Sequence, residues 1–240
     1  MTVTSAFPVE APTAEGDWVR LVTKAPELVL STRPVVVVAP HPDDETLAVG
    51  GLLAELRLRN VDVHVIAVTD GEASHPGDRG LAARRRQEQE AALRELGIDR
   101  PPERLGLPDS HVADHVDRLR SAIETCCRPE TVVLAPWEHD GHTDHDACGV
   151  AARRATERTG ATLLAYPVWA WQWAGLDVLS PLPLYRATLT AGTRAAKARA
   201  VACYPSQTTA HDGPPIVAAG SLVRFARPWE VVIDVPRASR

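Results

Sequence analysis

The stretch from Val35 to Leu47, VVVVAPHPDDETL, decides the fold of this chain. Its four consecutive valines predict a strand that is buried on both faces, as in the centre of a parallel sheet. Leucines at helical spacing follow in residues 46–59 and predict a helix. One imidazole and three carboxylates lie between them, at the carboxyl end of the strand, where open α/β sheets place their ligand crevice. The stretch therefore predicts a βα unit and a functional site together.

The rest of the chain repeats this alternation of strand and helix. Further strands are predicted at residues 61–68, 104–107, 131–135, 161–166, 184–190 and 229–235. Further helices are predicted at residues 81–96, 112–127, 144–159 and 193–204. The alternation is typical of a Rossmann-like α/β fold with a doubly wound, mostly parallel sheet. We expect a flexible arm over residues 1–17, a single α/β domain over residues 18–240, and an irregular Trp- and Pro-rich C-terminal portion.

The composition excludes several classes of partner and of structural site. The net charge of −5 argues against nucleic acid or an anionic membrane as partner. The four cysteines form no C-x-x-C pair, so neither a disulfide framework nor a zinc ribbon is expected. The N-terminus lacks the features of a signal peptide, and no run approaches the ~20 apolar residues that span a bilayer. We expect a cytoplasmic protein that acts on a small molecule, and the sequence leaves a homo-oligomer open.

A second polar cluster, from His139 to His145, follows the strand predicted at residues 131–135. Like the first cluster, it stands at the carboxyl end of a strand. Because the carboxyl ends of parallel strands share one edge of the sheet, we expect the two clusters to meet in space.

Metal chemistry suits the residues of these two clusters. Zn²⁺ accepts imidazole and carboxylate ligands, and a catalytic zinc keeps three protein ligands and one water. His41 and Asp44 would supply two ligands, and His145 or His142 the third. Zinc lowers the pKa of its water to ~7, and Asp43 would then accept the proton. A second imidazole could donate a proton to the leaving group.

The segment from Pro40 to Glu45 resembles the signature of the PIG-L/LmbE family of zinc-dependent N-deacetylases, which remove acyl groups from amino-sugar amides. The segment from Gly141 to His145 is similar to the family's second metal motif, which more often has Pro in place of Thr143. Three weaker segments resemble the family's loop after the second strand, the next helix, and a C-terminal helix with its exit: residues 69–72, 85–97 and 197–207. The resemblance runs in the family's order over residues 34–207.

The resemblance implies a metal centre and a base. It implies His41, Asp44 and His145 as the zinc ligands. Fe²⁺ can also occupy such sites. It further implies Asp43 as the general base that activates water.

The resemblance also implies roles around the substrate. His142 would be the imidazole that stabilises or protonates the tetrahedral intermediate, and Asp144 would orient it. Arg85 and Asp109 match positions at which family members that act on glucosamine-type sugars grip the sugar hydroxyls.

The function that the resemblance implies is a zinc-dependent N-deacetylase: a hydrolase that removes an acyl group, expected to be acetyl, from an amino sugar or glycoconjugate. One alternative is a metal-dependent phosphoesterase, against which stands the lack of a Gly-rich phosphate cradle and of lysine near the site. Another is an amidohydrolase that acts on a non-sugar amide. A dinucleotide-binding module is disfavoured because no G-x-G-x-x-G follows the first strand.

Several other polar residues have structural explanations. We expect Glu45 to stabilise a helix start, His64 to be a core or edge histidine, and Cys148 to be a buried small hydrophobe. Glu72 either closes its loop or reaches the metal water.

The role of the tryptophans at positions 169, 171 and 173 is the least determined by the sequence. Alternate positions would put all three on one side of an extended segment. Packing in the core and an aromatic wall for a sugar ring or acyl chain are equally plausible roles.

Overall fold

The computed structural model describes residues 12–75, 77–210 and 215–236. Residues 1–11, most of the predicted arm, lie outside the described residues. Helix α1 (Glu15–Thr23) begins within the last residues assigned to the arm and buries Trp18 and Val22 completely. The domain that was expected to start at residue 18 therefore includes a helix that begins at Glu15.

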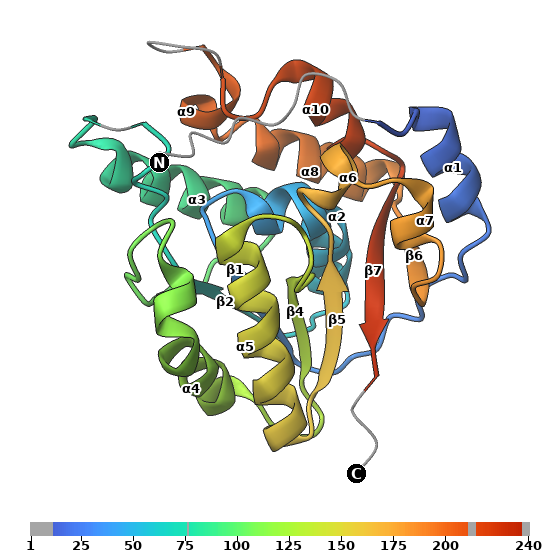
Figure 1. Ribbon diagram of the computed structural model, residues 1–240, viewed down its shortest axis with the longest axis horizontal. Coiled ribbons are helices and arrows are strands. Elements are labelled where there is room, and N and C mark those ends of the chain that lie inside the picture. Colours follow the sequence, from blue (N-terminus) through green and yellow to red (C-terminus); the bar gives the residue numbers. More distant parts are fainter. Residues whose placement is uncertain (1–11, 76, 211–214, 237–240) are drawn as a thin grey trace.

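Seven strands form one sheet. They are β1 (Val35–Ala39), β2 (Val63–Ala67), β3 (Glu103–Arg104), β4 (Val132–Pro136), β5 (Thr162–Tyr166), β6 (Leu184–Thr188) and β7 (Trp229–Val235). Their order across the sheet is β3-β2-β1-β4-β5-β7-β6 (Figure 1). The first five in this order run parallel, and β7 pairs antiparallel with both β5 and β6. The predicted mostly parallel sheet is confirmed.

Helices cover both faces of this sheet (Figure 1). The long ones are α2 (Asp44–Leu58), α3 (Leu81–Glu95), α4 (Val116–Cys126), α5 (Thr143–Thr159) and α8 (Ala191–Val201). The short ones are the 3₁₀ turn η1 (Val112–His115), α6 (Ala170–Trp173), α7 (Leu176–Leu179), α9 (Pro205–Thr208) and α10 (Ala219–Phe225). Within the described residues, no helix is long and apolar enough to cross a membrane.

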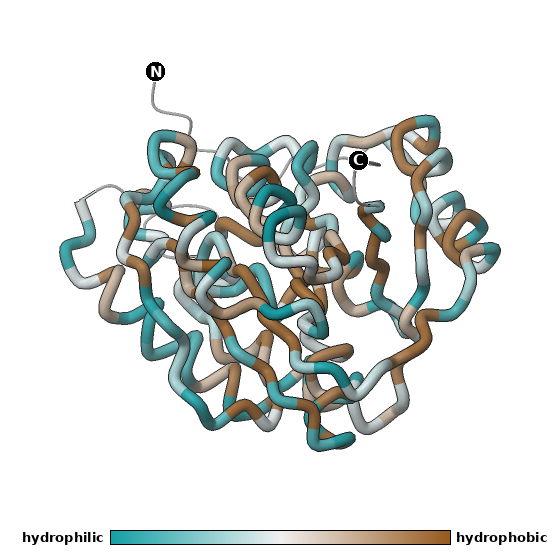
Figure 2. Tube along the Cα trace, turned by 90° about the horizontal axis from the view of Figure 1, so that it is seen from below, coloured by the Kyte–Doolittle hydropathy of each residue, from teal (hydrophilic) through white to brown (hydrophobic). Residues whose placement is uncertain are grey.

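The valine run of β1 is buried because successive side chains enter opposite cores. Val35 and Val37 pack into the core that includes Leu52 and other residues of α2. Val36 and Val38 pack into the second core, with residues of α4 and α5. Figure 2 shows hydrophobic segments running through the middle of the molecule, with hydrophilic stretches mainly around them. The sheet is therefore doubly wound.

Helix α2 is kinked at Val49, whose φ of −133° and ψ of 15° are not helical. The carboxylate of Glu230, on β7, accepts hydrogen bonds from the Gly51 N–H at 2.8 Å and the Leu52 N–H at 2.7 Å. Lys197 Nζ lies 2.7 Å from the same carboxylate. Glu230 thus caps the second half of α2, where the helical hydrogen-bond ladder is interrupted.

The prediction of an extended segment around the three tryptophans is wrong. Residues 170–173 form helix α6, so Trp171 points away from Trp169 and Trp173, which lie four positions apart on one side. Trp171 is buried and Trp173 is 41% exposed. Trp169, just before the helix, faces the polar clusters described below. Besides the predicted helix and two strands, the described C-terminal portion contains the short helices α6, α7, α9 and α10.

Candidate active site

Strand β1 lies where the order of successive strands in the sheet reverses. From β1 the parallel strands extend to β2 and β3 on one side and to β4 and β5 on the other. Open sheets bind ligands at such a switch point, outside the carboxyl ends of the strands. The polar clusters at residues 41–45 and 139–145 follow β1 and β4, the two strands that flank this point.

The turn from β1 to α2 carries a strained residue. Asp43 has a φ of 142° and a ψ of −29°, a region that non-glycine residues rarely adopt. Such strain is held only where the surroundings enforce it, and it concentrates at functional sites. The Thr69 hydroxyl donates to the Pro40 carbonyl at 2.9 Å and anchors the turn against the end of β2.

Three predicted ligands converge below this turn. His41 Nδ1 lies 3.1 Å from Asp44 Oδ2, and His145 Nε2 lies 3.2 Å from the same oxygen. His145 comes from the first turn of α5, which follows β4. Asp44 and His145 are buried, and the His41 ring is nearly so. The two nitrogens and the carboxylate oxygen lie within 4.8 Å of one another.

The outer nitrogen of each imidazole already has a carboxylate partner. His145 Nδ1 lies 2.8 Å from Asp140 Oδ2, and His41 Nε2 lies 3.1 Å from Asp144 Oδ2. Each outer nitrogen can donate a proton to its carboxylate, and a neutral ring that does so keeps its inner nitrogen free to bind a cation. The inner nitrogens then point lone pairs at Asp44.

Three electron-rich atoms facing each other fit a cation. Within the described part of the chain, His145 Nε2 is buried and makes no hydrogen bond, although Asp44 Oδ2 lies 3.2 Å away. Metal-binding histidines almost always donate their other N–H to a carboxylate or carbonyl, as His41 and His145 do here. Two imidazoles and a carboxylate are ligands that Zn²⁺ accepts. Without a cation a proton takes this place: burial opposes the charge, but Asp44 and Asp140 outweigh burial and raise the pKa of His145 to about 9.

Another group of potential metal ligands does not fit a cation in this way. His64, Glu103 and Cys126 bring ligand atoms together at the β2–β3 edge. His64 Nε2 lies 2.9 Å from Glu103, and His64 Nδ1 is buried without a partner among residues 12–75, 77–210 and 215–236. A metal on Nε2 would leave a buried N–H without an acceptor. His64 is therefore the edge histidine that the sequence predicted.

Asp140 is a functional candidate that the sequence interpretation missed. Its buried carboxylate accepts from His145 and from the backbone N–H groups of Val168, Trp169 and Ala170, each of these three at 2.9 Å. It thus fixes the His145 ring to the segment after β5. The available signal was an Asp in the loop five residues before a predicted ligand, but its direction depends on the fold of residues 168–170.

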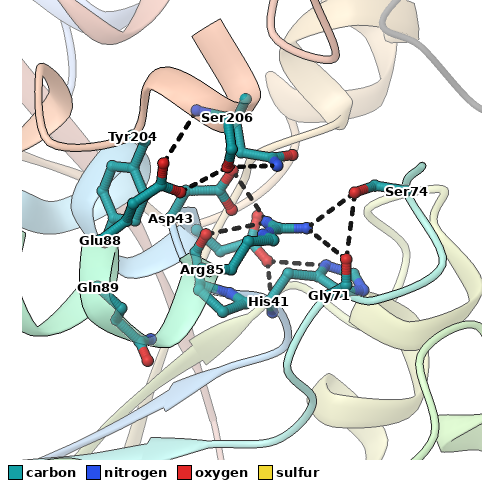
Figure 3. A network of polar contacts seen from close by, with 12 residues as sticks. His41, Asp43, Gly71, Ser74, Arg85, Glu88, Gln89, Tyr204 and Ser206 are labelled. Carbon is teal, nitrogen blue, oxygen red and sulfur yellow. Dashed lines mark hydrogen bonds and ion pairs between the residues drawn. The ribbon is translucent and has the colours of Figure 1, made fainter. Parts of the chain in front are cut away.

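Asp43 lies beside the metal-ligand group and against Arg85. Arg85 Nη2 lies 3.3 Å from Asp43 Oδ2 and donates to the Pro42 carbonyl at 2.9 Å, while Nη1 donates to the Gly71 carbonyl at 3.0 Å (Figure 3). Gly71 has a φ of 67°, and a Cβ there would overlap the guanidinium. Burial raises the pKa of Asp43 to about 7, with Arg85 opposing the rise and Asp44 adding to it.

The role of Arg85 in binding sugar hydroxyls stays a prediction. Its guanidinium is buried and held by the turn that carries Asp43. Asp109 is similarly engaged, with Oδ1 3.3 Å from His41 Nε2 and Oδ2 accepting from the Ala73 N–H at 2.8 Å. Both side chains still line the pocket above the cluster.

Asp144 contacts His142 through its backbone N–H and not through its carboxylate. The Asp144 N–H donates to His142 Nδ1 at 3.2 Å. The Asp144 carboxylate instead faces His41 and accepts from the Ser110 and Val112 N–H groups at 2.7 and 3.1 Å. Burial, together with the charges of His145 and His41, lowers the pKa of His142 to about 3.

Three neighbouring residues have structural roles. Glu72 Oε1 accepts from the Asp109 N–H at 3.0 Å, so Glu72 closes its loop. Glu45 is fully buried and accepts from the hydroxyl of Tyr204 at 3.1 Å, which agrees with a structural role. Cys148 is buried inside α5, as expected.

A pocket opens directly above these groups. Its polar side includes the two histidines His41 and His142 and the acids at positions 43, 44 and 109. Its other lining residues are Leu47, Ala73, Ser74, Arg85, Ser110, Trp169, Gln207, Ile216 and Val217. The pocket is thus lined by residues from distant parts of the chain, around one polar side.

Comparison with known proteins finds the same family that the motifs resemble. The sequence model of the PIG-L family, described as GlcNAc-PI de-N-acetylase, matches residues 36–156. A probable N-acetyl-alpha-D-glucosaminyl L-malate deacetylase 2 of Bacillus subtilis (strain 168) is 34% identical over 139 residues, which cover 52% of this chain and 61% of that protein. A 1D-myo-inositol 2-acetamido-2-deoxy-alpha-D-glucopyranoside deacetylase of Mycolicibacterium vanbaalenii is 41% identical over 147 residues, 48% of this chain and 51% of that protein. The chain thus spans between half and about three fifths of the length of these curated relatives.

The fold has solved counterparts. The crystal structure of a conserved protein of Thermus thermophilus superposes with a TM-score of 0.64 and 26% identity, over 87% of this chain and 97% of that one. The likeness therefore extends beyond the matched family region into the C-terminal portion that closes the pocket.

Proposed function

This chain belongs to the PIG-L family, and from that premise we propose that it is a metal-dependent hydrolase that removes an acetyl group from the nitrogen of an amino sugar. The observation that carries the proposal is the buried group of His41, Asp44 and His145, with the carboxylate of Asp43 beside it. A carboxylate next to a metal site is the arrangement that hydrolytic metalloenzymes use to activate water.

The relatives suggest the substrate class. One is named for N-acetyl-alpha-D-glucosaminyl L-malate and another for the 2-acetamido-2-deoxy-alpha-D-glucopyranoside of 1D-myo-inositol. Both names describe an N-acetylglucosamine joined in α linkage to a small polar group. We infer that this chain acts on an N-acetyl-α-D-glucosaminide of the same kind.

Three side chains would hold the metal: His41 through Nδ1, Asp44 through its carboxylate and His145 through Nε2. Zn²⁺ or Fe²⁺ in this position supplies Lewis acidity toward the amide oxygen and toward water. Asp140 and Asp144 hold the two rings in the tautomer that offers the inner nitrogen.

Asp43 is the group placed to move the proton. Its carboxylate takes a proton from the attacking water and returns it to the amine as the C–N bond breaks. Arg85 fixes this carboxylate through the Pro42 carbonyl and through the ion pair itself.

His142 is placed to stabilise the negative charge that develops on the amide oxygen. Its Nδ1 accepts a backbone N–H, so the neutral ring carries its proton on Nε2 and can donate it in a hydrogen bond. A neutral donor of this kind acts as an oxyanion stabiliser. Of the two roles that the resemblance implies for His142, stabilisation agrees better with this contact than protonation.

The test is a mass-spectrometric screen. Freshly purified protein, assayed for bound metal, is incubated with N-acetyl-α-D-glucosaminides and with acylated amines that lack a sugar. Loss of acetyl from the glucosaminides alone is the expected result. Cleavage of the non-sugar amides, or release of phosphate from phosphate esters by protein that carries two metals, would replace the proposal with one of its alternatives.

A further inference from the structure

Gln207 lies in the wall of the pocket but has no place in the mechanism above. It belongs to α9, outside the residues that the family model matches, and its side chain is fully buried. It lines the pocket together with Asp43 and His142. A buried polar side chain in a substrate pocket needs a partner, either in the protein or in the ligand.

The orientation of the Gln207 amide follows from its neighbours. Glu88, on α3, accepts from the Ser206 N–H at 3.0 Å and also from the Ser206 hydroxyl (Figure 3). Because that hydroxyl donates its proton to Glu88, its oxygen can only accept a hydrogen bond from Gln207. Gln207 Nε2 lies 3.0 Å from Ser206 Oγ and is the donor. The nitrogen and oxygen of the amide are therefore distinguished by the network.

This assignment leaves the oxygen of the Gln207 amide without a donor in the described part of the free protein. Gln207 Oε1 is buried and has no hydrogen-bond partner in residues 12–75, 77–210 and 215–236. It can only accept. The backbone around it is fixed, since the Gln207 carbonyl accepts from the Val217 N–H at 2.9 Å and Glu88 holds Ser206.

We propose that Gln207 is a substrate-binding residue whose Oε1 accepts a hydrogen bond from a donor of the substrate. The inference rests on the proposed function and adds a determinant from the C-terminal part of the chain. An acceptor that is oriented in advance and already desolvated loses little on binding, so it discriminates between substrates that have the donor and analogues that lack it.

An N-acetylglucosaminide offers two donors next to the bond that is cut. One is the N–H of the acetamido group, and the other is the hydroxyl on the neighbouring ring carbon. Both satisfy the same acceptor, so the chemistry that Gln207 recognises is an N–H or O–H close to the scissile amide. Analogues that lack one donor at a time distinguish the two.

The test compares Gln207→Met with the matched control Gln172→Met. Gln172 is also fully buried and also has an amide atom without a partner in the described residues, but it does not line the pocket. On the best glucosaminide found in the screen, Gln207→Met is expected to lower kcat/KM roughly 5- to 150-fold, because a substrate donor is left buried without an acceptor. Gln172→Met should leave kcat/KM within about twofold, and its melting temperature shows whether it has folded.

The second arm repeats the comparison with a deoxy analogue and with an ester analogue that carries oxygen in place of the amide nitrogen. The effect of Gln207→Met should disappear for the analogue that lacks the recognised donor and persist for the other, as in a double-mutant cycle. Active wild-type protein with Gln207→Met unchanged on every substrate would overturn this inference alone. A metal-loaded wild type inactive on all glucosaminides would overturn the proposed function and the inference with it. A lowered melting temperature of Gln207→Met with unchanged kcat/KM would assign Gln207 to folding instead.

Discussion

Asp140 Oδ2 lies 2.8 Å from His145 Nδ1, on the side of the ring opposite to Asp44. The same carboxylate receives three backbone N–H groups from residues 168–170. One carboxylate therefore sets both the tautomer of a candidate metal ligand and the path of the chain that brings Trp169 to the pocket.

Replacing Asp140 should weaken metal binding without removing a ligand. In Asp140→Asn the amide no longer accepts as a carboxylate does, and the His145 ring loses its orientation. We expect a 10- to 100-fold loss of Zn²⁺ affinity, roughly the effect of losing such a partner. Competition with a chromogenic chelator measures it. Asp146→Asn, in the same loop and bonded to the Gly141 N–H, is the control and should bind zinc as the wild type does.

Asp43→Asn should separate chemistry from metal binding. The variant keeps His41, Asp44 and His145 and should retain the metal, whereas turnover should fall by about 10²- to 10⁴-fold because no general base remains. His41→Ala should lose the metal itself. Elemental analysis and initial rates on the same preparations provide the measurement. Near-normal rates in Asp43→Asn would contradict the assignment of the base.

Removal of the metal should abolish activity and lower the melting temperature. The metal would bind only the folded protein, in which Asp44 and His145 are assembled, so its binding energy adds to stability. A chelator followed by dialysis gives the metal-free protein, and Zn²⁺ or Fe²⁺ is then added back. A melting curve unaffected by the chelator, together with full activity, would mean that the cluster holds no metal.

The tryptophans should separate into structural and substrate-binding residues. Trp171 is 5% exposed, with its ring 5.1 Å from that of Trp18 and beneath the Arg227 guanidinium. Trp171→Ala should cost about 3–5 kcal/mol of stability, as for other buried aromatics. Trp169→Ala should keep the melting temperature and raise KM, because its ring lies 5.3 Å from His142 beside the pocket. Urea unfolding and steady-state kinetics on both variants decide the matter, and the opposite pattern would refute it.

The buried pair of Glu230 and Lys197 beside the kink of α2 should stabilise the fold. In Glu230→Gln the Lys197 ammonium stays buried without a counter-charge, which costs about 3–5 kcal/mol. The double variant Glu230→Gln/Lys197→Met removes the unpaired charge and should recover part of the loss. The free energy of unfolding in urea measures both. Additive losses in the double variant would show that the two groups do not act as a pair.

The general architecture could be predicted from local sequence because its cause is local. Four valines in a row require burial on both faces, and this alone indicates a central parallel strand with helices on either side. Most helices and strands lie close to their predicted positions for the same reason. The exception is the segment around Trp171, where alternate aromatic positions suggested an extended chain. The three N–H groups that bind Asp140 turn this segment into α6 instead, and their partner is 28 to 30 residues away in sequence.

The sequence by itself determined the order of the elements and pointed to the polar residues at the ends of β1 and β4, since residue type and spacing are local properties. Only the tertiary structure decided which polar atoms face each other. It turned the Asp144 carboxylate to His41, placed Arg85 against Asp43, and left the Gln207 oxygen buried without a partner among the described residues. The physical reason is that a hydrogen bond depends on direction and on distances of about 3 Å. Those are set by the packing of helices from distant parts of the chain, which no run of residues encodes alone.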